Sequence, residues 1–282
     1  MNIRAGEVSF KYAKAQKNTL NGLDFEVKDG EIFGFLGPSG AGKSTTLGIL
    51  TGIITGWSGT VEVGGRNPAE ADGDFYRSIG VCFESPRFHM KFTAAENLKL
   101  FGGLYGIKLR DMRELMDRVG LAGDLYRKVE TYSKGMKTRL SLVRSLLHNP
   151  DLLFLDEPTT GLDPRLSQTV CELIQEERER GKTIFLTTHD MVTAGSLCDR
   201  VGFLNNGDLI ITDSPAVLAQ RFGSREVKVE CTRSPAEEFP MEGLADNEAF
   251  LALCRSGTVE TIHSREASLD DIFRRVTGQN LT

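Results

Sequence analysis

The segment GPSGAGKST, residues 37–45, has the residue types and the spacing of a phosphate-binding loop. It fits the pattern G-x-x-x-x-G-K-[ST] through Gly37, Gly42, Lys43 and Ser44. Glycines let backbone N–H groups approach phosphate oxygens, Lys43 reaches the β- and γ-phosphates, and the Ser44 hydroxyl is a ligand for Mg²⁺. A glycine-rich turn with an incidental lysine is the alternative. The residues assigned to the nucleotide are Gly37, Pro38, Ser39, Gly40, Ala41, Gly42, Lys43, Ser44 and Thr45.

Two acids and a histidine are of the types that hydrolyse a bound nucleotide. The run LLFLDE ends in Asp156, a candidate Mg²⁺ ligand, and Glu157, a candidate for polarising the attacking water. A surface acid pair before Pro158 is the alternative reading. His189 ends the run TIFLTTH and is placed to hydrogen-bond the γ-phosphate, although a lone histidine is more often structural.

These groups need elements that bring them together. Residues 31–36 read as a buried strand that enters the phosphate loop, and apolar residues at helical spacing follow the loop. Residues 151–157 and 183–189 read as short buried strands of a parallel sheet, joined by a helix that begins at Asp163-Pro164. Parallel strands end at the same edge of a sheet, which is where ligands bind in α/β proteins.

The remaining segments indicate an α/β fold with additions. In EVSFKY, Val8, Phe10 and Tyr12 share one face, and residues 93–148 have helical periodicity. A hairpin is expected around Asn206-Gly207, followed by a helix that stops at Gly223. Beyond residue 224 we expect a strand and a last helix with a capping box at its start. The predicted fold is a P-loop core with an N-terminal antiparallel β region, an inserted helical subdomain and a small C-terminal α+β appendage.

Composition excludes some classes of function. The chain has 282 residues with 34 basic and 39 acidic side chains, so its formal charge is 34 − 39 = −5, and we expect no nucleic-acid partner. The five cysteines show no zinc-site spacing and are expected to be reduced core residues. The first residues lack the apolar block of a signal peptide, and the sequence has no apolar run of the roughly 20 residues that a membrane helix needs. Any membrane role is therefore expected to come through a partner.

A second segment, YSKGMKTRL at residues 132–140, also has the residue types of a phosphate site. It combines a hydroxyl residue, a glycine and basic residues at the expected start of a helix. On its own this segment reads equally well as a capped helix with a basic surface.

In this order along the chain, the motifs resemble those of the nucleotide-binding subunit of an ABC transporter. GPSGAGKST is similar to its Walker A, LLFLDE to its Walker B, residues 160–163 to its D-loop, His189 to its switch histidine and YSKGMKTRL to its signature motif. The resemblance covers about residues 1–221, with the helical subdomain at about 93–148 and the appendage at 224–282. It implies ATP and Mg²⁺ as cofactors.

In that family two subunits pair head to tail, and each ATP lies between one subunit's Walker A and the other's signature. The resemblance therefore implies that Ser133 and Gly135 serve the ATP of the partner, that Asp163 belongs to the same nucleotide site, and that Tyr12 stacks on adenine. Ordinary packing of the Tyr12 ring is the alternative.

Two departures from the family pattern stand out. The common signature LSGGQ is here YSKGM, with Lys134 in place of a glycine, which is similar to the branch that exports drugs, peptides and lipids. The usual glutamine before the helical subdomain is Glu84, a carboxylate that is a candidate Mg²⁺ ligand. Residues 86–92 would, by the same resemblance, receive a cytoplasmic helix of the permease; local packing is the alternative.

The sequence thus predicts the ATPase subunit of an ABC exporter. It is expected to be cytoplasmic, peripheral on the cytoplasmic face of the membrane, and to pair with a second nucleotide-binding subunit, identical or not, on separate membrane-spanning permease subunits. A soluble ABC ATPase that acts on ribosomes or DNA is the main rival; such proteins usually carry two cassettes or a long coiled coil, and neither is visible. A P-loop phosphotransferase is a third possibility, which the signature, D-loop and switch histidine argue against.

Overall fold

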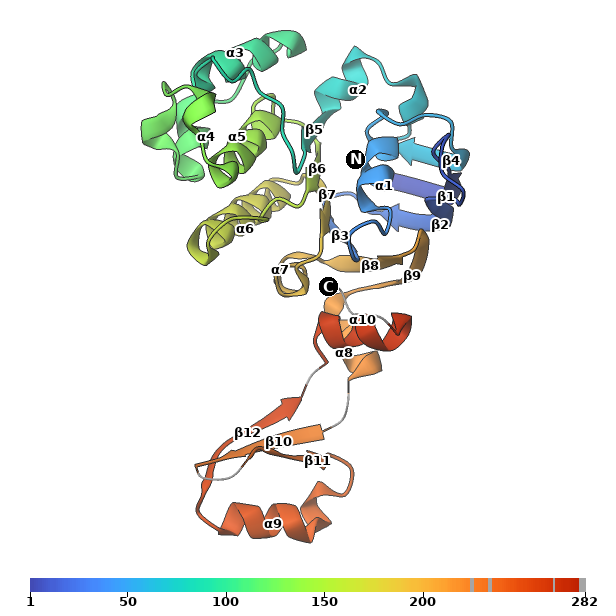
Figure 1. Cartoon of the computed structure of the whole chain (residues 1–282), viewed down its shortest axis with the longest axis vertical. Helices are drawn as coiled ribbons and strands as arrows, with labels where there is room; N and C mark the ends of the chain where they lie inside the picture. Colours follow the sequence, from blue (N-terminus) through green and yellow to red (C-terminus); the bar gives the residue numbers. More distant parts are fainter. Residues whose placement is uncertain (224–225, 233–234, 266, 279–282) are drawn as a thin grey trace. The chain divides into compact units, whose positions relative to one another are not determined.

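A computed structural model describes residues 1–223, 226–232, 235–265 and 267–278 (Figure 1). The chain forms two compact units, the first comprising Met1–Ser214 and the second beginning at Pro215.

A six-stranded sheet in the order β5-β6-β7-β3-β8-β9 forms the centre of the first unit. All neighbouring strands are parallel except β8 and β9, which form the hairpin expected around Asn206-Gly207. This arrangement confirms the predicted α/β core. The strand bounds are β3 Ile32–Leu36, β5 Ile79–Cys82, β6 Leu152–Asp156, β7 Thr183–Thr188, β8 Arg200–Asn205 and β9 Asp208–Asp213.

Strand β3 lies inside the sheet, between β7 and β8. Its sequence, IFGFL, has no charged side chain, so the strand can be covered on both faces of the sheet, and all five of its residues are buried. Its register against β7 pairs Leu36 with Thr188, and β6 pairs Asp156 with Thr187. The three strands therefore end at one edge of the sheet. The phosphate loop, Glu157 and His189 each follow directly after one of these ends.

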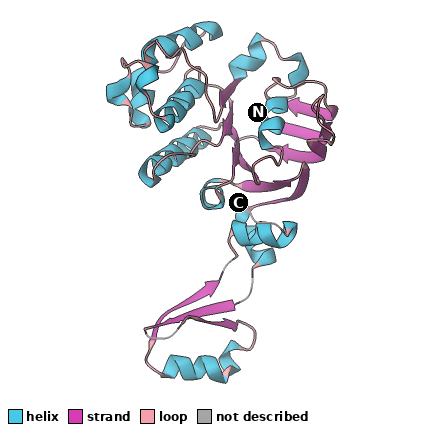
Figure 2. Cartoon of the chain, viewed as in Figure 1, coloured by secondary structure: helices cyan, strands magenta, loops and turns pink. Residues whose placement is uncertain are grey.

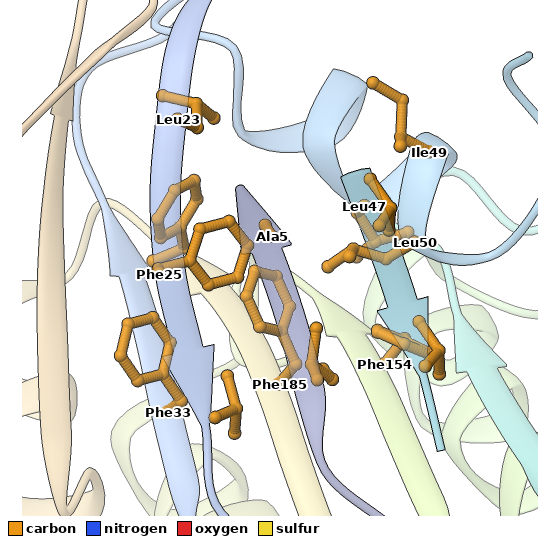
Figure 3. Close-up of a cluster of buried hydrophobic side chains, with 14 of the residues drawn as sticks. Ala5, Leu23, Phe25, Phe33, Leu47, Ile49, Leu50, Phe154 and Phe185 are labelled. Atoms are coloured by element: carbon orange, nitrogen blue, oxygen red, sulfur yellow. The ribbon is translucent and has the colours of Figure 1, made fainter. Parts of the chain in front are cut away.

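An aromatic cluster holds this sheet against the N-terminal part of the chain (Figure 3). The Phe25 ring lies 6.0 Å from Phe33, 5.3 Å from Phe35 and 6.1 Å from Phe185, measured between ring centroids. Phe154 packs on Phe185 from the next strand, at 6.0 Å. Rings at such separations add a small favourable term to the apolar area that they bury.

The N-terminal residues form the expected antiparallel region, a three-stranded sheet in the order β2-β1-β4. Its strands are β1 Ile3–Phe10, β2 Leu20–Val27 and β4 Ser58–Val63. The expected alternation extends only to the end of β1. Val8 is buried and Phe10 is half-buried, whereas Tyr12 lies beyond the strand and is 45% exposed. Within β1, the pairing with β2 shifts register between Ala5 and Val8, where Glu7 has the uncommon backbone angle φ +52°.

Helices cover both faces of the large sheet in Figure 2. Helix α1 (Lys43–Leu50) lies between it and the N-terminal sheet, and α6 (Pro164–Glu179) lies on the other face. As expected, α6 begins at Asp163-Pro164, and the Asp163 carboxylate accepts a hydrogen bond from the Leu166 N–H at 3.0 Å. The remaining helical segments that connect the strands of this unit, outside the predicted helical segment described next, are the 3₁₀ turn Pro68–Glu70, α2 Gly73–Ser78 and α7 Met191–Leu197.

The segment predicted to be helical contains α3 (Ala94–Tyr105), α4 (Met112–Arg118) and α5 (Lys134–Leu146). Short 3₁₀ turns at Ala122–Asp124 and Val129–Thr131 join the last two of these helices. These helices follow β5 and precede β6, so the segment is an insertion between two neighbouring strands of the sheet.

The second unit has its own small sheet, in the order β11-β10-β12, with a core of Val227, Val229 and Phe239. Helix α8 packs on α10, which begins with the predicted Ser268/Asp271 capping box. This packing explains why the compact unit begins at Pro215, before the boundary expected at residues 221–224. The elements are α8 Pro215–Phe222, β10 Glu226–Cys231, β11 Glu237–Pro240, the 3₁₀ turn Leu244–Asp246, α9 Glu248–Arg255, β12 Val259–Arg265 and α10 Leu269–Thr277.

All five cysteines are free thiols, but they are not all core residues. Cys82 and Cys198 are buried, Cys171 and Cys231 are half-buried, and Cys254 is exposed on α9. The expectation of a core position was wrong for Cys254 because α9 is covered by the small sheet on one face only. None of the helices described here is long and apolar enough to cross a membrane.

Candidate nucleotide site

The phosphate loop surrounds a pocket of about 350 Å³ at the carboxyl end of β3. Two glycines are required by space as well as by backbone conformation. A Cβ on Gly37 would lie 2.1 Å from the Leu204 carbonyl oxygen, and a Cβ on Gly42, at φ +114°, would lie 2.6 Å from Leu20. The pocket is lined by Thr19, Pro38, Ser39, Gly40, Gly42, Lys43, Ser44, Thr45, Glu84 and Glu157.

Lys43 is folded back into the loop. Its ammonium group donates hydrogen bonds to the carbonyl oxygens of Gly37 at 2.6 Å and Pro38 at 3.2 Å, and it lies 3.8 Å from Glu157 Oε1. Burial lowers the pKa of Lys43, an effect that the nearby carboxylates of Glu157 and Asp156 partly offset. A cation held by two neutral carbonyls at the wall of a pocket is well placed to exchange them for phosphate oxygens.

Ser44 lines this pocket, and Asp156 places two further hard oxygen atoms beside the Ser44 hydroxyl. The Ser44 hydroxyl lies 3.3 and 3.4 Å from the two carboxylate oxygens of Asp156, and Thr187 donates a hydrogen bond to the same carboxylate at 2.5 Å. The described residues contain no group of three or more His, Cys, Asp or Glu side chains that would hold a metal alone. One carboxylate and one hydroxyl fit Mg²⁺, which usually completes its shell with phosphates and water.

Glu157 is a buried carboxylate with a fixed orientation. Its backbone has φ +51°, an uncommon conformation for a residue other than glycine. The Thr160 hydroxyl donates to Oε2 at 3.0 Å, and His189 Nδ1 lies 2.9 Å from both carboxylate oxygens. His189 itself is 55% exposed. The structure therefore brings Lys43, Glu157 and His189 into one row at the edge of the sheet.

Tyr12 lies against the helix side of the phosphate loop. Its hydroxyl is 3.2 Å from the Thr45 hydroxyl, and its ring meets the Phe10 ring edge-on at 4.8 Å. One face of the Tyr12 ring thus stays available beside the loop, since the side chain is nearly half exposed.

The signature segment opens α5 and lies outside this pocket. Ser133 caps the helix by accepting a hydrogen bond from the Met136 N–H at 3.2 Å, and a Cβ on Gly135 would lie 3.0 Å from Leu162. In the part of the chain that the structure describes, neither Ser133 nor Gly135 lines the phosphate pocket, and the same holds for Asp163. These predicted residues are therefore not brought to the nucleotide of their own chain.

Tyr132, the first departure from the family signature, is a structural residue. It is 4% exposed, and its hydroxyl donates to the Asp124 carbonyl oxygen at 2.6 Å. Burial raises its pKa to about 12. This tyrosine fixes the start of α5 to the 3₁₀ turn that precedes it.

Glu84 lines the phosphate pocket from the loop after β5, and its carboxylate lies 4.0 Å from Lys134 Nζ on α5. Sequence reasoning did not foresee this contact. The two residues are 50 positions apart, and the only signal was that both depart from the family pattern.

A second, larger pocket of about 720 Å³ lies between β5 and the helical segment. Its walls include Tyr76, Phe101, Tyr105 and Arg144. The Arg144 guanidinium lies over the rings of Phe88 at 4.8 Å and Phe101 at 4.6 Å, and it donates to the Arg87 carbonyl oxygen at 3.0 Å. These contacts hold Arg87 and Phe88, in the segment of residues 86–92, against the helical segment.

A P-loop at the end of a central parallel strand, with two acids and a histidine on the neighbouring strands, defines a nucleoside-triphosphatase of the P-loop class. The comparisons with known proteins identify its family. Residues 20–160 match the model of the ABC transporter family, and residues 225–266 match that of the fluoroquinolone efflux ABC transporter C-terminal domain. The chain belongs to the ABC transporter family and is one of its ATP-binding, ATP-hydrolysing subunits.

Two relatives and two solved structures illustrate the likeness. The chain is 48% identical to a fluoroquinolones export ATP-binding protein of Mycobacterium tuberculosis, over 99% of this chain and 94% of that protein. It is 34% identical to the linearmycin resistance ATP-binding protein of Bacillus subtilis, over 93% of this chain and 83% of that protein.

Among solved structures, an ATP-binding subunit of an ABC transporter superposes with a TM-score of 0.72 at 28% identity, covering 79% of this chain and 94% of that one. A dimeric ATP-binding cassette bound to ADP and Pi shares the fold, with a TM-score of 0.69 at 24% identity. The match covers 76% of this chain and 98% of that one.

Proposed function

We propose that this chain is the ATPase subunit of an exporter, and that it drives transport by closing on ATP with a second nucleotide-binding subunit. The proposal is supported by the relatives, several of which are named as export ATP-binding proteins. The observation that carries it is the row formed by Lys43, Glu157 and His189, with 3.8 Å between the lysine and the glutamate and 2.9 Å between the glutamate and the histidine.

In this proposal the residues of the phosphate loop, Gly37 to Thr45, bind the phosphates through their N–H groups and through Lys43. Ser44 and Asp156 hold Mg²⁺, and Glu84, which lines the phosphate pocket together with Ser44, is a further ligand. The metal, when bound, neutralises charge on the β- and γ-phosphates. Tyr12 offers its exposed ring face to the adenine base.

Hydrolysis is assigned to Glu157. Its carboxylate is oriented by Thr160 and His189, so it accepts a proton from a water that attacks the γ-phosphate. A carboxylate accepts hydrogen bonds only, so the proton of the His189 contact is on Nδ1. His189 then both orients the base and presents its exposed ring to the phosphate.

Ser133, Gly135 and Asp163 are assigned to the nucleotide of a second subunit, identical or not. Supporting this, they lie outside the phosphate pocket of their own chain, while Ser133 and Gly135 occupy the start of a 13-residue helix whose first turn contains no acid. The positive end of a helix dipole favours an anion there.

The membrane partner is assigned to the larger pocket. Its aromatic lining and the loop of residues 86–92, in which Arg144 holds Arg87 and Phe88, suit a permease segment with an apolar face. With such a partner the chain is peripheral on the cytoplasmic face of the membrane. A soluble ATPase that acts on ribosomes or DNA is the rival, and recovery with ribosomes instead of a membrane protein would favour it.

The test uses Glu157→Gln, which keeps the shape of the side chain and removes its basicity. We expect ATP binding to persist, hydrolysis to become very slow, and the trapped ATP form to elute as a dimer in size-exclusion chromatography with Mg²⁺. Glu172→Gln, an exposed carboxylate on α6, serves as the control. A Glu157→Gln protein that hydrolyses ATP at the wild-type rate would refute the assignment.

A further inference from the structure

The start of helix α5 has an unusual charge distribution. Its first residue is Lys134, and Lys137 follows one turn later, while its first turn contains no acid. Cations at a helix N-terminus oppose the helix dipole, so this arrangement does not help the helix to form. A binding partner with negative charge explains the arrangement better than helix stability does.

Within one chain, that negative charge comes from Glu84. The Lys134 ammonium lies 4.0 Å from Glu84 Oε1, with the two side chains 66% and 47% exposed. Ion pairs this exposed hold only loosely. Both partners are therefore free to separate when a stronger counter-charge arrives.

Glu84 also faces the phosphate loop. It lines the same pocket as Lys43, and its negative charge acts on the Lys43 ammonium. One carboxylate on the loop after β5 thus lies between the lysine of the chain's own phosphate site and the lysine of its signature segment.

We propose that Glu84 and Lys134 form a latch within one chain, and that Lys134 leaves Glu84 for the phosphates of the nucleotide bound by the second subunit when the dimer closes. This inference rests on the proposed function, because it needs the start of α5 to face a nucleotide in trans. Lys134 then supplies a charge-assisted contact to phosphate between Ser133 and Gly135. Glu84 sets how readily that contact forms.

The first experiment tests the latch in the chain without nucleotide. A carbodiimide joins a carboxylate to an amine that is already paired with it, and mass spectrometry then finds the linked residues. We expect a Glu84–Lys134 link in the monomer, and mixing of ¹⁵N-labelled and unlabelled chains shows that it forms within one chain. The Lys128–Glu130 pair, at 3.9 Å with side chains 60% and 47% exposed, is the matched control. Absence of the Glu84–Lys134 link where the control pair is joined overturns the latch.

The second experiment tests the exchange, using Glu157→Gln to trap the closed form. We expect ATP and Mg²⁺ to abolish the Glu84–Lys134 link while the Lys128–Glu130 link persists. A Glu84–Lys134 link that survives in the ATP-bound dimer overturns the exchange. If Glu157→Gln forms no dimer with ATP, the proposed function fails and the exchange fails with it, whereas the first experiment still decides the latch.

A double-mutant cycle in the Glu157→Gln chain separates the contact of Lys134 with Glu84 from its proposed contact with phosphate. Lys134→Met should raise the ATP concentration needed for half-maximal dimer by about tenfold, as loss of a hydrogen bond to a charged group implies. Glu84→Gln should lower that concentration by about twofold, since it frees an exposed ion pair. In the Lys134→Met chain this roughly twofold gain from Glu84→Gln should disappear, which leaves only the effect of Glu84 on the phosphate pocket of its own chain, and Lys128→Met should match the parent. An undiminished effect of Glu84→Gln in the absence of Lys134 would overturn the proposal.

Discussion

His189 Nδ1 lies 2.9 Å from both carboxylate oxygens of Glu157, so the more exposed side chain holds the more buried one. The contact joins the ends of two neighbouring strands, β7 and β6, in a sheet whose register is fixed by their backbone hydrogen bonds. The position of the proposed base therefore depends on a residue that is open to solvent.

Replacing His189 with alanine should reduce hydrolysis without removing ATP binding. The substitution leaves the Glu157 carboxylate with its hydroxyl donors, Thr160 and Thr188, and with Lys43 at 3.8 Å, but without the imidazole that orients it. We expect turnover to fall by about 10²-fold or more, the range of general acid–base catalysis. Steady-state phosphate release and a fluorescent-ATP titration measure the two effects. His263→Ala, on the exposed face of β12, is the control, and equal turnover in the two variants would contradict the prediction.

Replacing Ser133 with arginine should separate nucleotide binding from dimer formation. Ser133 caps α5 but does not line the phosphate pocket of its own chain, so the monomer should keep its ATP affinity. The long side chain should prevent a second subunit from approaching the start of the helix. Titration of the monomer with fluorescent ATP and size-exclusion chromatography of the Glu157→Gln double variant check both parts. Loss of ATP affinity in the monomer would show that the signature segment acts within one chain.

Glu177 should be a large contributor to stability. Its side chain is 1% exposed and lies 2.7 Å from the Arg110 guanidinium, 2.5 Å from Arg180 and 3.7 Å from Lys182, measured to its carboxylate oxygens. Glu177→Ala leaves these cations without their shared counter-charge and should cost about 3 to 5 kcal/mol of unfolding free energy. Urea unfolding measures the change. The control is Glu176→Ala, whose half-exposed pair with Arg118 should cost less than about 1 kcal/mol; similar losses in both variants would refute the prediction.

His148 should make the fold less stable in mild acid. Its ring stacks on Tyr105 at 3.8 Å, Nε2 donates to the Ile79 carbonyl oxygen at 2.8 Å, and Nδ1 is buried with no partner among the described residues. Burial lowers the pKa of His148 below the ordinary value of a histidine, about 6.5. The unfolded chain therefore binds this proton first as pH falls below about 6.5, and stability is lost at up to about 1.4 kcal/mol per pH unit until the folded-state pKa is reached.

The variant that tests this is His148→Phe, which keeps a ring against Tyr105 and removes the titrating group. Urea unfolding at pH 8, 7, 6 and 5 should show a shallower loss of stability in the variant than in the parent. The variant should also lose about 1 kcal/mol at pH 8, because the Ile79 carbonyl loses its donor. An identical slope between pH 7 and 5 in both proteins would show that His148 does not carry the effect.

The fold could be predicted from the sequence because its signals are local. Continuous apolar runs mark the buried strands β3, β6 and β7, turn residues mark the hairpin after β8, and capping residues mark the starts of α6 and α10. The predicted α/β core and antiparallel N-terminal region are confirmed. The expectation that Tyr12 shares one face with Val8 and Phe10 was wrong, because β1 ends at Phe10 and Tyr12 lies beyond the strand, 45% exposed.

The candidate site was predictable in its members but not in its contacts. Motif spacing identified Lys43, Glu157 and His189, and their roles in catalysis stay predictions. The row that they form depends on the order of strands in the sheet, which no local pattern states. The same reason hides the Glu84–Lys134 pair and the Arg144 side chain between Phe88 and Phe101, since each joins segments that are distant in sequence.

Strand β3 carries the phosphate loop, yet it ends at Leu36 and its neighbours in the sheet are β7 and β8, which end at Thr188 and Asn205. On the ribosome, at 5 to 20 residues per second, the chain needs roughly 10 to 30 seconds to pass from β3 to β8. For most of that interval, until β7 has been made, a strand of sequence IFGFL has no partner on either edge, which is the state in which strands aggregate. The strand that carries the phosphate loop is therefore among the first to be made and among the last to be paired on both edges.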